Sequence, residues 1–315
     1  MFISRRYRHD NEQVVLVLTV LLVLGVIAVT SAATFCLSGV FIIVMFVLSA
    51  WMVRSHHQSL IRDAVSVDRV STPGLSAVVD QCRNKLQPGP VNVFLAEKRQ
   101  MNAYTFGISS PKVLVLYTPL VRVMDTGELK FVIGHEMGHV ALGHTWLNTI
   151  VGGLAGIPAP FGAAVLLYAA FRWWNRMCEF SADRAGLLAC GDLNLAITAL
   201  VKLVAPEIRT QTDFDRAMAM IDAQDDDPSN RLAEAFQTHP MLIRRINKLR
   251  DYVTTNEYHR LQAGVNRNVG MVDERKTQPE KIKQSAHDTP VQEQEPRQQR
   301  EPSPEERWPW LKPKD

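Results

Sequence analysis

The chain has 315 residues, of which 46% are hydrophobic and 21% are charged, and its formal net charge is +3 at pH 7. This length provides one domain of about 200 residues plus additional segments. The small net charge gives no indication of a nucleic-acid partner. Four cysteines without a C-x-x-C pair or framework spacing indicate free thiols in a reducing compartment, not a disulfide-stabilised secreted protein.

Two apolar runs follow a short basic N-terminus. Residues 14–30 and 35–53 carry no charged side chain, and each is about long enough to cross a bilayer as a helix. Arginines flank the outer ends of the pair, whereas the connecting residues 31–34 have none, so both ends are predicted to be cytoplasmic. We therefore expect residues 1–54 to contain a two-helix transmembrane hairpin. A cleaved signal peptide and two buried core helices are the alternatives, and the first fits poorly because a second span follows at once.

The composition from residue 55 is that of a soluble domain, which we expect to extend over residues 55–255. Pro73 and Gly74 open a predicted helix that ends at Leu86. Three short runs rich in β-branched and aromatic residues follow it and predict a small antiparallel sheet. These runs are 91–96, 103–109 and 112–117.

The segment 131–142 reads F-V-I-G-H-E-M-G-H-V-A-L and holds an H-E-x-x-H pattern within a predicted helix. His135 and His139 are four residues apart, so their imidazoles share one helix face and can bind one zinc ion. Glu136 is rotated from that face by roughly 100°. It can therefore act as a general base on an attacking water instead of binding the metal.

Four residues indicate where this helix begins and where another element can approach it. Asp125 and Glu128 form a D-x-x-E capping box that predicts its start. Gly134 and Gly138 are poor helix formers, so we expect each of them to let another element approach the helix backbone closely.

The stretch after this helix holds one more histidine and a third apolar run. His144 would face away from the histidine pair on a continuous helix, and we expect it not to be a ligand. Residues 146–171 are uncharged and interrupted by glycines and prolines. Because candidate ligands on both sides of the run must meet, and two spans need about 20 residues each, we expect a hairpin turning at 156–160. The hairpin either dips into the membrane surface or belongs to the core.

The segment 179–186 reads E-F-S-A-D-R-A-G on a second predicted helix. Glu179 and Asp183 are four apart and share a face, so Glu179 can complete the metal site as a third ligand. Asp183 can then accept the second ring N–H of a ligating histidine and fix its tautomer. The side chain of Cys178 would point away from this face, and we interpret Cys178 as a packing residue.

The C-terminal part is predicted to be helical and then disordered. Residues 256–315 form a predicted disordered charged tail, because they are increasingly rich in Gln, Glu, Lys, Arg and Pro. The apolar cluster 308–311 near its end can dock a partner or a membrane surface. The predicted helices before the tail are 193–204, 213–223 and 241–252.

The motifs H-E-M-G-H at 135–139 and E-F-S-A-D-R-A-G at 179–186 together resemble those of the HtpX-like membrane zinc metalloproteases, relatives of the CAAX prenyl proteases. The resemblance covers residues 90–250 and the N-terminal pair of spans. The chain departs from HtpX in one respect, because it has a single short, interrupted apolar run between its second histidine and its glutamate. Further matching segments are Asn102-Ala103 and Thr238-His239-Pro240 followed by Arg245-Ile246.

The resemblance implies an α+β fold, mainly α, built as a gluzincin-type metalloprotease domain with one zinc ion. The implied zinc ligands are His135, His139 and Glu179, and the implied general base is Glu136. The resemblance also implies that His239 and Arg245 approach the site and stabilise the oxyanion or hold the substrate carbonyl. Asn102 and Ala103 would lie on the edge strand that pairs with a peptide substrate.

The function that we expect is that of a membrane-anchored zinc endopeptidase in a bacterial inner membrane, with its catalytic domain facing the cytoplasm. Its substrates would be proteins or peptides, and the resemblance implies quality control of membrane proteins. Two alternatives stay open: a CAAX-type processing protease that cleaves near a prenylated terminus, and a non-enzymatic scaffold whose tail recruits partners. A structural zinc site normally has four protein ligands. This chain offers three ligands and an unused Glu136, which favours catalysis.

Overall fold

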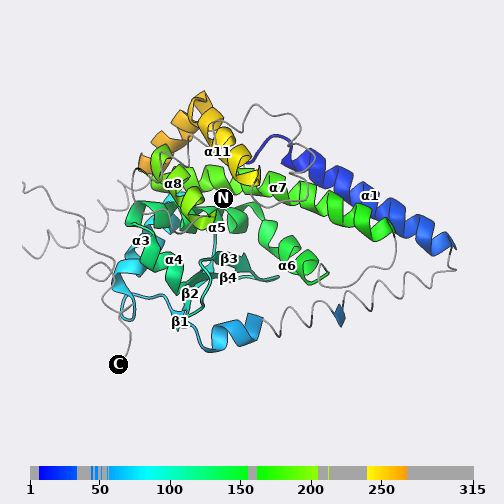
Figure 1. Ribbon diagram of the computed structural model, residues 1–315, viewed down its shortest axis with the longest axis horizontal. Helices are drawn as coiled ribbons and strands as arrows, with labels where there is room; N and C mark the ends of the chain where they lie inside the picture. Colours follow the sequence, from blue (N-terminus) through cyan, green and yellow to red (C-terminus); the bar gives the residue numbers. More distant parts are fainter. Residues whose placement is uncertain are drawn as a thin grey trace, which may run out of the picture.

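The structure is a computed structural model, and it describes residues 7–33, 57–154, 162–204 and 240–267 with single positions at 44, 47, 48, 51, 55 and 212. The fold is mainly helical α+β, with helices α5 and α7 at its centre (Figure 1). The elements in chain order are α1 (Glu12–Ala33), β1 (Val65–Ser66), α3 (Pro73–Leu86), β2 (Val91–Ala96), β3 (Ala103–Phe106), β4 (Lys112–Tyr117), α4 (Thr118–Val123), α5 (Thr126–Leu142), α6 (His144–Leu154), α7 (Gly162–Cys190), α8 (Leu193–Val204) and α11 (Pro240–Val253). Residues 57–62 and 256–267 are also helical.

The four-stranded sheet is mixed, so the prediction of an antiparallel sheet is wrong. Its strand order is β1-β2-β4-β3. Strands β3 and β4 form an antiparallel pair, whereas β2 and β4 are parallel, with Val91 opposite Lys112. After β2 the chain crosses to the far edge of the sheet, where it forms β3. It then turns back, and β4 lies between β2 and β3. Apolar periodicity defines each strand but not its neighbours. Strand β3 ends earlier than predicted, because Gly107 at φ +127° turns the chain.

Small residues bring α5 and α7 unusually close together. A Cβ atom added at Gly134 would lie 2.4 Å from the Cβ of Ala189, and one at Gly138 would lie 2.6 Å from the Cβ of Ala185. Neither space can hold a side chain without displacement of the opposite helix. The prediction that these two glycines admit another element is therefore confirmed. The close approach places the histidine face of α5 against the carboxylate face of α7.

Helix α5 begins and ends where its sequence dictates. The Asp125 side chain accepts a hydrogen bond from the Glu128 backbone at 2.8 Å, and Glu128 accepts one from the Asp125 backbone at 2.9 Å. This capping box was predicted. Glu128 also forms an ion pair with Lys202 of α8 at 2.7 Å. At the other end, Gly143 has a left-handed φ of +81°, which ends α5 and lets α6 begin at His144.

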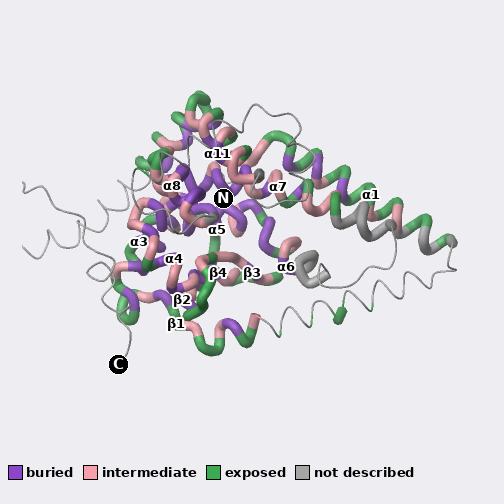
Figure 2. The backbone as a smooth tube through the Cα atoms, in the orientation of Figure 1, coloured by how far each residue is buried: buried purple, intermediate pink, exposed green. Residues whose placement is uncertain are grey.

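The main hydrophobic core gathers buried side chains from the sheet and from α3, α4, α5, α7, α8 and α11 (Figure 2). It extends into residues 256–267, where Tyr258, Leu261 and Val265 are buried. The predicted start of a disordered tail at residue 256 is therefore too early, because three apolar side chains at helical spacing anchor this otherwise polar segment. The predicted helix 213–223 and most of the tail lie outside the described residues.

Helix α1 lies alongside α7 (Figure 1). Val15 is buried with Trp174 and Cys178, and the Thr19 hydroxyl donates a hydrogen bond to the Ala170 carbonyl at 3.3 Å. On its other side, α1 exposes large aliphatic side chains. These include Val14, Val17, Leu18, Val20, Leu21, Leu24 and Val29.

The structure describes only part of the predicted membrane segments. Within the described ranges, no helix combines the length and the apolar character needed to cross a bilayer. The second predicted span, 35–53, lies mostly outside these ranges. The predicted hairpin 146–171 consists of α6 and the first part of α7, and its turn at 156–160 is also outside the described residues.

Candidate metal centre

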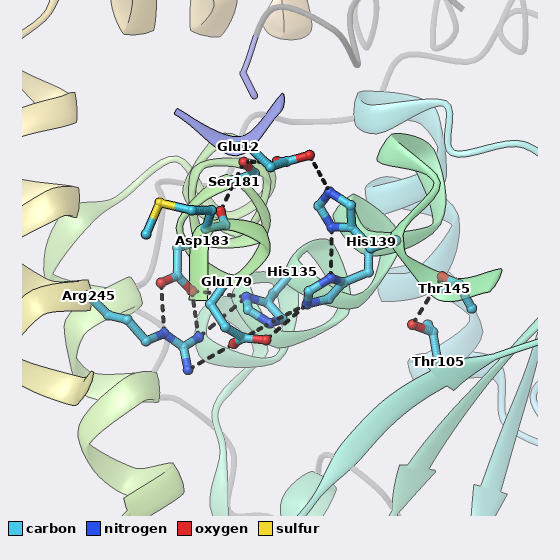
Figure 3. Close-up of polar contacts among 11 residues, drawn as sticks. Glu12, Thr105, His135, His139, Thr145, Glu179, Ser181, Asp183 and Arg245 are labelled. Carbon is cyan, nitrogen blue, oxygen red and sulfur yellow. Dashed lines mark hydrogen bonds and ion pairs between the residues drawn. The ribbon is translucent and has the colours of Figure 1, made fainter. Parts of the chain in front are cut away.

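Three predicted ligands meet between α5 and α7 (Figure 3). The Nε2 atoms of His135 and His139 are 3.2 Å apart. The carboxylate of Glu179 faces both rings, with one oxygen 3.5 Å from His135 Nε2 and the other 3.5 Å from His139 Nε2. Two imidazole nitrogens and one carboxylate thus converge on a single point.

The geometry and charge of this group fit a zinc ion. A tetrahedral zinc with bonds of about 2.0–2.1 Å separates its ligand atoms by about 3.3 Å, close to the spacings found here. Burial alone would lower the pKa of His135, but hydrogen bonds and charges from Asp183 and Glu179 raise it to about 10. The carboxylates therefore stabilise positive charge at the point where the three donors meet. This donor set, nitrogen with one carboxylate, is one that zinc prefers.

His135 is held by a carboxylate on the helix that provides the third donor. Asp183 Oδ1 lies 2.9 Å from His135 Nδ1, the contact that the spacing of 179 and 183 predicted. Arg245 of α11 donates to both oxygens of Asp183 at 2.6 and 2.8 Å and pairs with Glu179 at 3.3 Å. Burial would raise the pKa values of both carboxyl groups, but the Arg245 charge and hydrogen bonds outweigh it and lower them.

Arg245 thus contacts the residues around the metal centre, and its side chain is 18% exposed. The resemblance implied that Arg245 stabilises an oxyanion or holds a substrate carbonyl. In the structure the guanidinium is engaged by the buried carboxylate of Asp183 and the partly buried one of Glu179, so it orients both. His239, the other residue implied in this role, lies outside the described residues.

His139 is held by a second chain of contacts. Its Nδ1 atom lies 3.0 Å from Nδ1 of His144, and Nε2 of His144 lies 3.0 Å from Oε1 of Glu12. The expectation that His144 faces away is therefore wrong. It assumed one continuous helix, whereas Gly143 ends α5 and α6 brings the ring back to His139. Burial lowers the pKa of His144 to about 4 despite its hydrogen bond to the Glu12 carboxylate.

A model of peptidase family M48 matches residues 72–253, more than half of the chain. The chain belongs to peptidase family M48. The resemblance to HtpX-like proteases is thus confirmed at the level of this family.

Two relatives illustrate the extent of the similarity. The chain is 29% identical over 192 residues to the plastoglobule-localized metallopeptidase 48 of Arabidopsis thaliana, covering 56% of each protein. It thus spans little more than half of that protein's length. It is 25% identical over 231 residues to a protease HtpX homolog of Burkholderia mallei, covering 62% of this chain and 80% of the homolog.

The predicted general base of this M48 peptidase lies beside the ligands. Glu136 is on α5 with only 8% of its surface exposed. Within the described part of the chain, its carboxylate has no hydrogen bond or ion pair, unlike the carboxylates of Glu12, Glu179 and Asp183. A carboxylate without a protein partner is available to exchange a proton with a water molecule.

The predicted substrate strand lies at an edge of the sheet of this M48 peptidase. Strand β3 is last in the strand order, after β4. Asn102 is exposed just before it, and its side chain accepts a hydrogen bond from the Ala103 backbone at 2.9 Å. Thr105 of β3 lies 3.5 Å from Thr145 of α6, which connects the strand to the helix after the histidines (Figure 3).

Proposed function

We propose that this M48 peptidase is a zinc-dependent endopeptidase whose metal is held by His135, His139 and Glu179. The observation that carries this proposal is the orientation of the two rings. Both Nε2 atoms face Glu179, while both Nδ1 atoms face partners outside the ligand set. Imidazole ligands of zinc use one nitrogen for the metal and a hydrogen bond at the other to fix the tautomer.

The roles of the side chains follow from their positions. A bound zinc supplies a Lewis acid that polarises a carbonyl and makes a water molecule more acidic. Glu136 takes a proton from the attacking water and delivers it to the leaving amine, the exchange expected of a buried carboxylate that has no hydrogen bond or ion pair among the described residues. Asp183 holds His135, and Arg245 holds both Asp183 and Glu179. The peptide to be cleaved would pair with the outer edge of β3, starting at Asn102 and Ala103.

The test combines metal content with cleavage of an unfolded protein. We expect one zinc per purified chain, activity that a chelator removes, and activity that added zinc restores. Glu179→Gln should lose both metal and activity, because a neutral amide is a weaker ligand. Glu257→Gln, at an exposed position of the helix 256–267, is the matched control and should keep both. A parent protein that binds zinc firmly but cleaves nothing would favour a structural zinc site in a scaffold.

The physiological substrate that we propose is a misassembled or damaged membrane protein, as the resemblance to HtpX-like proteases implies. Cleavage of an unfolded protein without a lipid group would support it. Activity restricted to peptides with a prenylated terminus would instead support a CAAX-type processing protease. A protein with no cleavage of either substrate would contradict both.

We also propose that the N-terminal region anchors the protein in a bacterial inner membrane, with the catalytic domain in the cytoplasm. Two observations support this: the aliphatic surface of α1, and arginines outside the two apolar runs with none between them. The protein should stay in the membrane fraction after extraction at alkaline pH. A reporter fused after residue 54 should be cytoplasmic, and a periplasmic reporter would contradict the proposed orientation.

A further inference from the structure

We propose that Glu12, in the first turn of α1, is a positioning residue for the metal ligand His139 and acts on it through His144. This inference rests on the proposed zinc site. Glu12 is fully buried, 60 residues before the segment that the family model matches begins. Its carboxylate lies 3.0 Å from His144, whose other nitrogen lies 3.0 Å from His139.

The order of these contacts permits only one arrangement of protons once the metal is bound. Nε2 of His139 binds the metal, so its Nδ1 carries the proton and donates to Nδ1 of His144. The His144 ring is then a neutral acceptor at Nδ1, and its remaining N–H, at Nε2, donates to Glu12. The three residues thus form a line of hydrogen bonds from His139 through His144 to Glu12. The ionised Glu12 carboxylate at its end favours this arrangement, because it can only accept hydrogen bonds.

Glu12 is itself fixed by several contacts, and Figure 3 shows the one to Ser181. Arg8 pairs with it at 2.5 Å, and the Ser181 hydroxyl of α7 donates a hydrogen bond to its second oxygen. Arg8 also donates to the backbone carbonyl of Leu142, the last residue of α5, at 2.8 Å. The N-terminal arm is therefore attached to both helices of the metal centre. A buried carboxylate held in this way can transmit a fixed orientation to His144.

A second metal ion is the competing explanation for this cluster. Glu12, His144 and Cys178 place possible ligand atoms within 4.8 Å of one another. Two observations favour the hydrogen-bonded line instead. Both nitrogens of His144 already have partners, and the guanidinium of Arg8 provides the positive charge next to Glu12. A second equivalent of bound zinc in the parent, lost in Cys178→Ala, would contradict the proposal.

The first experiment measures the zinc affinity of the full chain by competition with a chelator. Glu12→Gln keeps the size of the side chain and removes its charge. Zinc affinity should fall by up to about tenfold, the lower end of the range for partners of metal-bound histidines, because the effect passes through one ring. The absorption spectrum of the cobalt-substituted protein should also change, since the orientation of His139 changes.

Two control variants separate positioning from general effects. Asp10→Asn removes a neighbouring but exposed carboxylate. Thr19→Val removes the buried hydrogen bond between α1 and α7 without touching the line to His139. Both should keep the zinc affinity and cobalt spectrum of the parent. If Thr19→Val lowers affinity as much as Glu12→Gln, helix docking is the cause and the proposal is wrong.

Substitution of His144 extends the test to cases in which Glu12→Gln does not fold. His144→Phe should lower zinc affinity at least as much as Glu12→Gln, and His144→Gln, with one acceptor and one donor, should restore part of it. The double variant Glu12→Gln/His144→Phe should be no weaker than His144→Phe alone. The proposal would be overturned if the losses of zinc affinity in the two single variants multiplied in the double variant. It would also be overturned if His144→Phe bound zinc like the parent. A parent that binds no zinc would instead contradict the proposed function.

Discussion

The two histidines of the metal centre have the same chemistry but different surroundings. His135 contacts a carboxylate directly, at 2.9 Å, and that carboxylate lies one turn from the third ligand on the same helix. His139 contacts another histidine, and the nearest carboxylate in that line belongs to α1, 127 positions earlier in the chain than His139. One ligand is therefore oriented from within the matched family segment, and the other from outside it.

This difference shows how a segment outside the family match can contribute to the metal centre. Asp183, Glu179 and Arg245 form a self-contained group of one cation and two carboxylates. The group around His139 is completed only when Arg8 docks against the end of α5 and Glu12 docks against Ser181 within α7. Damage to the N-terminal arm should therefore affect one ligand and spare the other.

The largest effect is expected from loss of either ligand. His135→Ala and His139→Ala should each abolish stoichiometric zinc binding and peptide cleavage, because two remaining donors hold the metal weakly. Thermal stability should fall as well, since metal binding is coupled to folding. Metal analysis, cleavage and thermal unfolding test this, with the exposed His259→Ala as control. Zinc retained at parental affinity in either variant would show that the histidine is not a ligand.

A smaller effect is expected at Asp183. Asp183→Asn should lower zinc affinity or activity by about 10–100-fold, because the direct partner of a metal-bound histidine is lost. The loss should exceed that of Glu12→Gln, whose effect passes through His144. Chelator competition on both variants measures the difference. Equal losses would remove the distinction between a direct and an indirect carboxylate.

The helix pair that carries both histidines can be tested at Gly134. Gly134→Ala places a methyl group 2.4 Å from the Cβ of Ala189, so it should destabilise the fold by about 1–3 kcal/mol. Gly264→Ala has no atom within 4 Å of the new Cβ and should be stabilising by about 0.5–1 kcal/mol. Denaturant unfolding compares the two variants. An unchanged Gly134→Ala protein would contradict the close approach of α5 and α7.

The smallest effect is expected from the C-terminal tail. Deletion of residues 272–315 should leave zinc content and peptide cleavage unchanged, because the composition of this segment cannot form a core. The deletion leaves the contacts around His135 and His139 in place. Zinc loss in the truncated protein would show that the tail belongs to the fold.

The helix pair of the site could be predicted from local sequence alone. The H-E-x-x-H spacing, the capping box at Asp125 and the glycines at 134 and 138 all act within a few residues. The spacing of Glu179 and Asp183 likewise places both carboxylates on one helix face. Short-range patterns of this kind depend only on helix geometry, and the structure has the helices at those positions.

The features that local patterns missed depend on contacts between distant segments. The parallel pairing of β2 and β4 depends on where β3 lies, which no single strand encodes. The orientation of His144 depends on the turn at Gly143, and a left-handed glycine there was the available signal. Glu12 and Arg8 read as a polar start to an apolar helix. The burial of Glu12 and the partial burial of Arg8 follow only from the docking of α1 on α7.

The most direct test of the account is the metal content and turnover of Glu136→Gln, measured on the same preparation. The substitution keeps the size of the side chain and leaves the three ligands and both carboxylate partners in place. We predict a full complement of zinc and a fall in turnover of about 10²–10⁴-fold, the contribution of general acid–base catalysis. A variant that keeps parental turnover, or one that loses its zinc, would contradict the separation of base and ligands on which the account depends.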